Sequence, residues 1–124
     1  MAGYKMVRLL ARLVLWLHLL AVLALGALIA MSSDGNAVMG WLLFIGVDFP
    51  VSLGLVGLSY LIDGSAWLSP LDASGQYSIW RDINNFWLPA LYNGLVGSLW
   101  WYWLVRLSGS LLLRCRHYWK NRQS

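Results

Sequence analysis

Three long apolar stretches divide the chain, at residues 13–31, 37–62 and 86–106. Each is long enough to cross a bilayer as a helix, because about 20 residues at about 1.5 Å each cover a hydrocarbon core about 30 Å thick. The pattern therefore predicts an all-α integral membrane protein, a small bundle of three transmembrane helices. The connecting segments are short, so we expect one membrane domain over residues 1–124.

The second apolar stretch is interrupted in its middle by the sequence GVDFPVS, residues 46–52. Asp48 is costly in lipid and Pro50 lacks a backbone N–H, so the helix must kink or break there. One form is a kinked span in which Asp48 caps the second half. The other is a re-entrant hairpin with halves of about 11 or 12 residues. We favour the kinked span, because a re-entrant break frees backbone groups that other protein must cover.

The segments outside these stretches are more polar. Residues 32–36 (SSDGN) predict a tight turn between helices, and residues 63–85 form a polar loop. Residues 107–124 alternate apolar and basic positions, which predicts a C-terminal amphipathic helix on an anionic membrane surface. Tryptophans crowd the end of the third stretch, as is typical of a lipid interface. The residues assigned to this interface are Trp100, Trp101, Trp103, Arg106, Arg114, Arg116, Lys120 and Arg122.

Composition strengthens the membrane assignment. Hydrophobic residues make up 60% of the 124 positions and charged residues 11%, whereas soluble domains have about 45–50% and about 25%. The first stretch is longer than most signal-peptide cores, so we expect it to be a retained anchor. A composition rich in Leu, Ala, Gly, Arg and Trp favours a bacterial cytoplasmic (inner) membrane as the location.

The placement of charge bears on topology. Three of the nine Lys and Arg residues lie in the first 12 positions, five lie from Arg106 onward, and Arg81 lies between. Three full spans would put four cations on one side and five on the other, which also leaves insertion in both orientations open. The re-entrant form would put eight on one side, as the positive-inside rule favours. The Lys and Arg residues flank the apolar stretches, as is usual in membrane proteins, and this placement explains the net positive charge. We therefore expect no nucleic-acid partner.

Two ionisable residues, His18 and Asp48, lie deep in apolar stretches and are candidate functional residues. His18 lies 16 residues before Asp34 and Asp48 lies 14 residues after it. A tight turn at Asp34 would therefore bring both to nearly the same depth, about 3 Å apart along the axis. We interpret them as a buried pair that fixes helix register. The alternative is a proton relay or ion site, because imidazole titrates near neutral pH.

Small residues at helix positions favour close packing, and Gly54, Gly57, Gly94 and Gly97 are the candidates. The remaining polar residues in the stretches are expected to bond helix backbone or a neighbour; they are Ser52, Ser59, Tyr60, Asn93 and Ser98. Catalytic, nucleotide-binding and metal-binding motifs are absent, and Cys115 is the one cysteine. We therefore expect no catalytic residue, metal or cofactor.

These features favour a small, non-catalytic accessory or assembly subunit of a larger membrane complex. It would hold other membrane subunits, or copies of itself, by helix packing and an aromatic-rich interface. One alternative is a self-assembling pore, channel or transporter that conducts protons or ions through Asp48 and His18. The short length and basic tail resemble holin-like proteins in composition. A further alternative is a lipid-interacting regulatory protein, which the basic tail would bind to anionic lipid.

Overall fold

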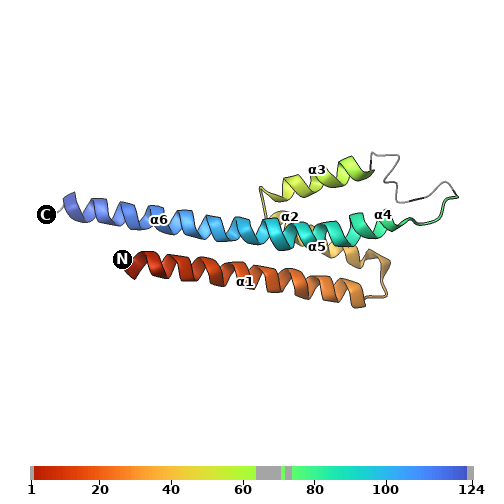
Figure 1. Ribbon diagram of the computed structural model, residues 1–124, viewed down its shortest axis with the longest axis horizontal. Coiled ribbons are helices and arrows are strands. Elements are labelled where there is room, and N and C mark those ends of the chain that lie inside the picture. The colour runs from red at the N-terminus through yellow and green to blue at the C-terminus, as the bar shows by residue number, and fades with distance from the viewer. Residues whose placement is uncertain (1, 64–70, 72–73, 123–124) are drawn as a thin grey trace.

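The computed structural model describes residues 2–63, 71 and 74–122, and these residues are almost entirely helical. Two long antiparallel helical segments form the body of the molecule (Figure 1). The first is α1, Ala2–Met31. The second, called helix 79–122 below, is continuous and consists of α4 (Ile79–Asp82), η2 (Ile83–Trp87), α5 (Leu88–Tyr92), η3 (Asn93–Gly97) and α6 (Ser98–Arg122). Both chain termini lie at the same end.

A constant antiparallel register joins α1 to helix 79–122. A Cβ built on Gly3 would contact Leu113, and one built on Gly109 would contact Val7. In the same register His18 bonds Ser98 and Val22 packs against Gly94. A small residue stands on one side of each of these contacts, so the two backbones can approach closely along most of the length of α1.

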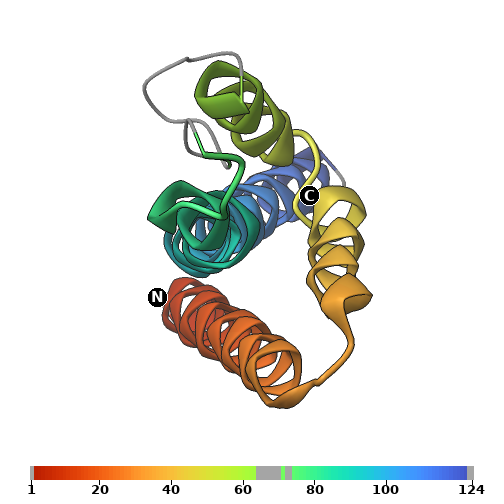
Figure 2. The ribbon, with the colours of Figure 1, turned by 90° about the vertical axis from the view of Figure 1, so that its right-hand side faces the viewer.

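The second apolar stretch folds as a helical hairpin. Its first arm comprises η1 (Gly35–Trp41) and α2 (Leu42–Val47), and its second arm is α3 (Ser52–Asp63). The arms meet at a turn over residues 48–51, about midway along the bundle, and α3 runs back to the end from which α2 came (Figure 1). The structure thus has the hairpin form, not the kinked continuous helix that we favoured. Figure 2 shows helix 79–122 between α1 and α3, with α2 at its side.

Because the hairpin divides the second apolar stretch into two shorter helices, neither of them is long enough to cross a membrane. Among the described helices, Gly3–Met31 is long and apolar enough to cross a membrane, whereas Gly35–Val47 and Ser52–Asp63 are shorter apolar helices. A bundle of three spanning helices is therefore not confirmed. What stands is an all-helical fold with one helix of spanning length and composition.

Two predicted boundaries also differ. Residues 107–122 continue α6 and do not form a separate surface helix, because nothing breaks the helix after Arg106 and Gly109 packs onto Val7 of α1. The predicted polar loop, residues 63–85, is already helical from Ile79, where Ser78 caps the helix by accepting a hydrogen bond from the Trp80 N–H. Residues 64–70, 72–73 and 123–124 lie outside the described part of the chain.

The apolar core is small and lies between α1, the first hairpin arm and α5. Its centre consists of Val22, Ile29, Trp41 and Phe44. Trp41 lies near both Phe44 and Phe86, with ring centroids 6.3 Å and 6.1 Å apart. Most other large apolar side chains face outward, as Leu13, Leu20 and Leu61 illustrate. The core therefore positions the hairpin, while much of the outer surface remains apolar.

Candidate functional site: a polar cluster at the hairpin turn

Asp48 lies at the end of α2, where the hairpin turns, and its side chain is fully buried. Its backbone N–H donates to the Phe44 carbonyl, and its own carbonyl accepts from the Ser52 N–H at 3.1 Å. The residue thus belongs to both arms of the hairpin. This backbone bonding aims its carboxylate inward, at the contact between α1 and α6.

His18 of α1 meets this carboxylate. Its Nε2 lies 2.7 Å from Asp48 Oδ1, and both side chains are buried. This contact is an ion pair when the imidazole is protonated. The other ring nitrogen, Nδ1, is 3.0 Å from Ser98 Oγ, in a hydrogen bond whose donor depends on the tautomer. The imidazole therefore joins the hairpin turn to the start of α6.

A third element reaches the same oxygen. The indole Nε1–H of Trp101 donates to Asp48 Oδ1 at 3.1 Å. The second oxygen, Oδ2, has no hydrogen-bond partner among the described residues. It lies against Gly97, where a Cβ would meet the Asp48 Cγ at 2.7 Å. Close approach of the carboxylate to α6 therefore requires glycine at position 97.

The turn itself is held by two hydroxyl groups. Ser52 Oγ donates to the Ile45 carbonyl, and Tyr92 of α5 donates its O–H to the Val51 carbonyl, both at 2.7 Å. Tyr92 also packs on Gly54, where any Cβ would collide with the phenol. Breaking a helix in lipid frees backbone groups that need new partners. Here side chains supply partners to two of the carbonyls next to the break.

Asn93 is the most enclosed polar residue of helix 79–122. It has no exposed surface, and neither of its side-chain amide atoms has a partner among the residues that the structure describes. It begins η3, a π-helical segment that also contains Gly94 and Gly97. Such segments are frequent at functional sites. The segment places Asn93 one turn from Gly97, on the side of the helix that carries the cluster.

The other predicted site residues are distributed as follows. Gly94 packs against Leu19 and Val22, whereas a Cβ on Gly57 would meet nothing within 4 Å. Trp103 is exposed and Trp100 half-buried, but Trp101 points into the cluster instead of serving the lipid interface. Arg106 lies over the rings of Tyr102 and Trp103. The tail cations Arg114, Arg116, Lys120 and Arg122 are exposed.

The cluster can position the hairpin, and it can hold a proton between a carboxylate and an imidazole. In the described part of the chain no group of three or more His, Cys, Asp or Glu side chains could hold a metal ion. Cys115 is exposed and lies in the distal part of α6. The arrangement that the structure supports is a buried hydrogen-bonding junction between α1, the hairpin turn and α6.

Sequence reasoning missed two residues of this junction. Tyr92 gave no signal, because a tyrosine near a span end is typical of an interface. Trp101 belongs to a run of consecutive aromatic residues that point in all directions around the helix, so the sequence did not distinguish it as inward-facing. The helical spacing from Ser98 to Trp101, three residues, could have shown that they share a face.

Known proteins give no independent guide to this site. Comparison with protein-family models, curated proteins and solved structures finds no match to the chain.

Proposed function

We propose that the protein is a small, non-catalytic accessory or assembly subunit of a larger membrane protein complex. One observation carries the proposal: Asp48 and His18 point inward and are enclosed, while the outer faces of the helices expose large apolar side chains. The polar chemistry thus serves to hold the helices together. The surface left for other molecules is apolar, as expected of a subunit that binds other helices in lipid.

The proposed membrane arrangement has two spanning segments, α1 and helix 79–122, with the hairpin entering from the side opposite the termini. Its main support is charge. Lys5, Arg8 and Arg12 start α1, and the five remaining cations apart from Arg81 lie in α6. The antiparallel pairing puts all eight toward the end that holds the termini (Figure 1). The positive-inside rule then makes that end cytoplasmic. The composition favours a bacterial inner membrane.

The C-terminal part of α6, at the end that holds the termini, is suited to bind lipid as well. Exposed cations alternate with exposed apolar residues such as Leu111, Leu112 and Trp119. Cations near a membrane surface attract anionic headgroups by about 1 kcal/mol each. Anionic lipid is therefore the proposed partner of this segment.

The proposed protein-binding face is the outer side of α3. This helix packs against α2 and α5, and its outward residues Leu53, Leu58 and Leu61 are exposed. It stands apart from α1 in the end-on view (Figure 2). A hairpin arm with so little support within the chain gains stability when an apolar helix of another subunit, or of a second copy, covers it.

Site-specific photo-crosslinking in the intact membrane tests this role. A photoreactive residue at Leu61 should form an adduct with another polypeptide, whereas one at Leu13, on the outer face of α1, should label mainly lipid. Native sizing after mild detergent extraction, corrected for bound detergent, should then show a protein mass above the 14.0 kDa of one chain. A monomer that crosslinks only to lipid from both positions would rule out the proposal.

The second candidate function is proton or ion conduction by a self-assembled form. The observation that favours it is an ionisable pair at mid-bundle, with Asp48 Oδ2 and the Asn93 amide unpaired in the described structure. Proteoliposomes that contain the purified protein and a pH-sensitive dye test it. Proton flux that Asp48→Asn abolishes would support conduction, and equal leakage from empty vesicles and from vesicles with protein would exclude it.

A further inference from the structure

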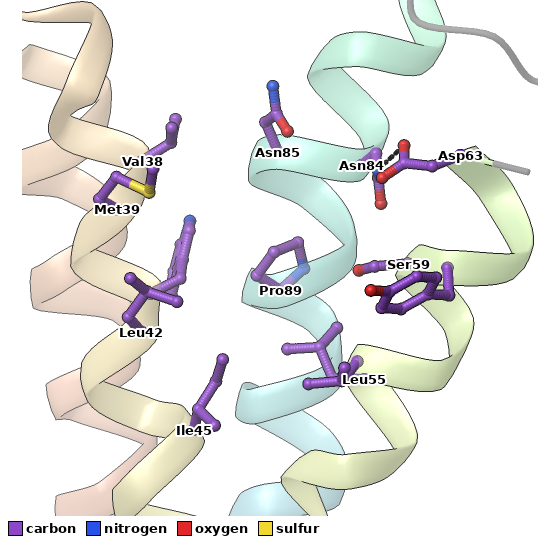
Figure 3. Close-up of a pocket in the computed structure, with 13 residues that line it drawn as sticks. Val38, Met39, Leu42, Ile45, Leu55, Ser59, Asp63, Asn84, Asn85 and Pro89 are labelled. Atoms are coloured by element: carbon purple, nitrogen blue, oxygen red, sulfur yellow. Dashed lines mark hydrogen bonds between the residues drawn. The ribbon is translucent and has the colours of Figure 1, made fainter.

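A cavity of about 650 Å³ lies between the two arms of the hairpin, over the side of helix 79–122. Its lining comes from α2 and η1 on one side, from α3 on the other, and from residues 84–89 at its base (Figure 3). Its volume falls within the range of about 300–1,000 Å³ typical of small-molecule sites. The polar cluster at the turn does not use this cavity.

The polarity of the cavity changes along its length. Figure 3 shows Asn84, Asn85 and Asp63 toward one end, facing Val38 and Met39 of the first arm, and Ser59 midway along, at the level of Pro89. The opposite end, nearer the turn, is formed by apolar side chains. Those labelled are Leu42, Ile45 and Leu55. A molecule aligned with this gradient has an aliphatic body and a polar head.

The polar end sets the chemistry of that head. Asp63 Oδ1 accepts a hydrogen bond from Asn84 Nδ2 at 2.6 Å, and Arg81 lies outside the cavity lining. The described residues of the lining include this carboxylate and no cation, so the site repels an anionic head. Ser59 points its hydroxyl toward the middle of the cavity, and the amide of Asn85 lies at the end that holds Asp63 and Asn84 (Figure 3). These groups suit a head that both donates and accepts hydrogen bonds.

The length of the cavity matches one membrane leaflet. From Leu55 to Asp63 the helix rises about 12 Å at about 1.5 Å per residue. Half of the hydrocarbon core is about 15 Å. The chain of a lipid that stays in its own leaflet can therefore enter between the arms while its head reaches the polar end.

From these features we infer that the cavity binds one aliphatic chain of an uncharged, hydroxyl-bearing amphiphile, of which a monoacylglycerol is the simplest example. The chain lies against Leu42, Ile45 and Leu55. The head exchanges hydrogen bonds with Ser59 and Asn85, near the Asp63–Asn84 pair. The inference is independent of the proposed subunit role, because it concerns the inner side of the hairpin arms.

The test uses a monoacylglycerol with a diazirine in its chain, added to the full-length protein in detergent micelles. Mass spectrometry should locate the adducts on cavity residues. Val56→Trp narrows the cavity and should reduce labelling at least tenfold, because displacing about two methylene groups of the bound chain already costs that much. The control is Leu13→Trp on the exposed outer face of α1, away from the cavity, and its labelling should stay within about twofold of that of the unmodified protein. Circular dichroism and sizing verify that both variants fold.

A smaller substitution and a second lipid test whether the cavity recognises the polar head group. Ser59→Ala removes one hydrogen bond and should weaken competition by unlabelled monoacylglycerol about fivefold. A fatty acid of equal chain length should compete at least tenfold less well at pH 8, and Asp63→Asn should reduce this difference. The inference is overturned if Val56→Trp labels as strongly as the unmodified protein, or if fatty acid and monoacylglycerol compete equally.

Discussion

His18 Nε2 and Asp48 Oδ1 lie 2.7 Å apart, and this contact fastens the turn of the hairpin to α1. Ser98 holds the other side of the imidazole, and Trp101 donates to the same carboxylate oxygen. Ser98 and Trp101, both in α6, therefore hold the pair that His18 of α1 forms with Asp48 at the end of α2. The junction lies where the chain leaves regular helix, so the pair stabilises the part of the fold that backbone hydrogen bonding supports least.

Removing the imidazole should destabilise the protein strongly. His18→Leu leaves the buried Asp48 carboxyl group without its imidazole partner, at an expected cost of about 3 kcal/mol or more in the free energy of unfolding if the pair is charged. Titration with a denaturing detergent, followed by circular dichroism, measures this loss. Leu17→Ala, on the exposed side of α1, is the control and should change stability little.

A double-mutant cycle separates the pair from the general effect of each change. Asp48→Asn and His18→Leu together should cost less than the two single losses added, with a coupling of about 0.5–3 kcal/mol. Strict additivity would mean that the 2.7 Å contact contributes nothing to stability.

Glycine at position 97 should be irreplaceable, even by alanine. The added methyl group would overlap the Asp48 carboxylate, so Gly97→Ala should lower stability and displace the hairpin turn. Gly57→Ala is the matched control in α3, because nothing lies within 4 Å of its Cβ. That change should be neutral or stabilise the helix by up to about 1 kcal/mol. Similar losses from both substitutions would contradict the packing at Gly97.

The hydroxyl of Tyr92 should stabilise the fold through one hydrogen bond, to the Val51 carbonyl. Tyr92→Phe keeps the ring but leaves the Val51 carbonyl without this donor, so we expect a loss of about 0.5–1.5 kcal/mol. Tyr60→Phe removes an exposed hydroxyl and serves as the comparison. Unfolding in denaturing detergent measures both, and equal stability of the two variants would show that the turn does not need Tyr92.

The hairpin makes a topological prediction that a kinked span does not. With Cys115 replaced by serine, single cysteines at Asn36 and Gln76 should react with a membrane-impermeant maleimide from the same side. The native Cys115 should react from the other side. Labelling of Gln76 from the side opposite to Asn36, with Cys115 reacting from the same side as Asn36, would show that the segment between Asn36 and Gln76 crosses the membrane.

The helical stretches and the depth of the central pair were both accessible from sequence. Runs of apolar residues predict helices because lipid or a core must cover them, and spacings of 16 and 14 residues from Asp34 gave His18 and Asp48 nearly the same depth. We considered the hairpin form but did not favour it. The sequence shows that a break would free backbone carbonyls in lipid, but it does not show which side chains would hydrogen-bond them. The side chains that do so are those of Ser52 and Tyr92, and Tyr92 is distant in sequence.

Apolar periodicity and composition alone predict an all-helical, largely apolar chain with a helix breaker at Asp48–Pro50. The direction of the chain after that breaker, the inward orientation of Trp101 and the close approach of Gly97 to a carboxylate depend on contacts between distant segments. The physical reason is that periodicity and composition are local, whereas the partners of Asp48 come from positions 18, 97 and 101. Whether a buried polar group is tolerated depends on such distant donors, and only the folded chain brings them together.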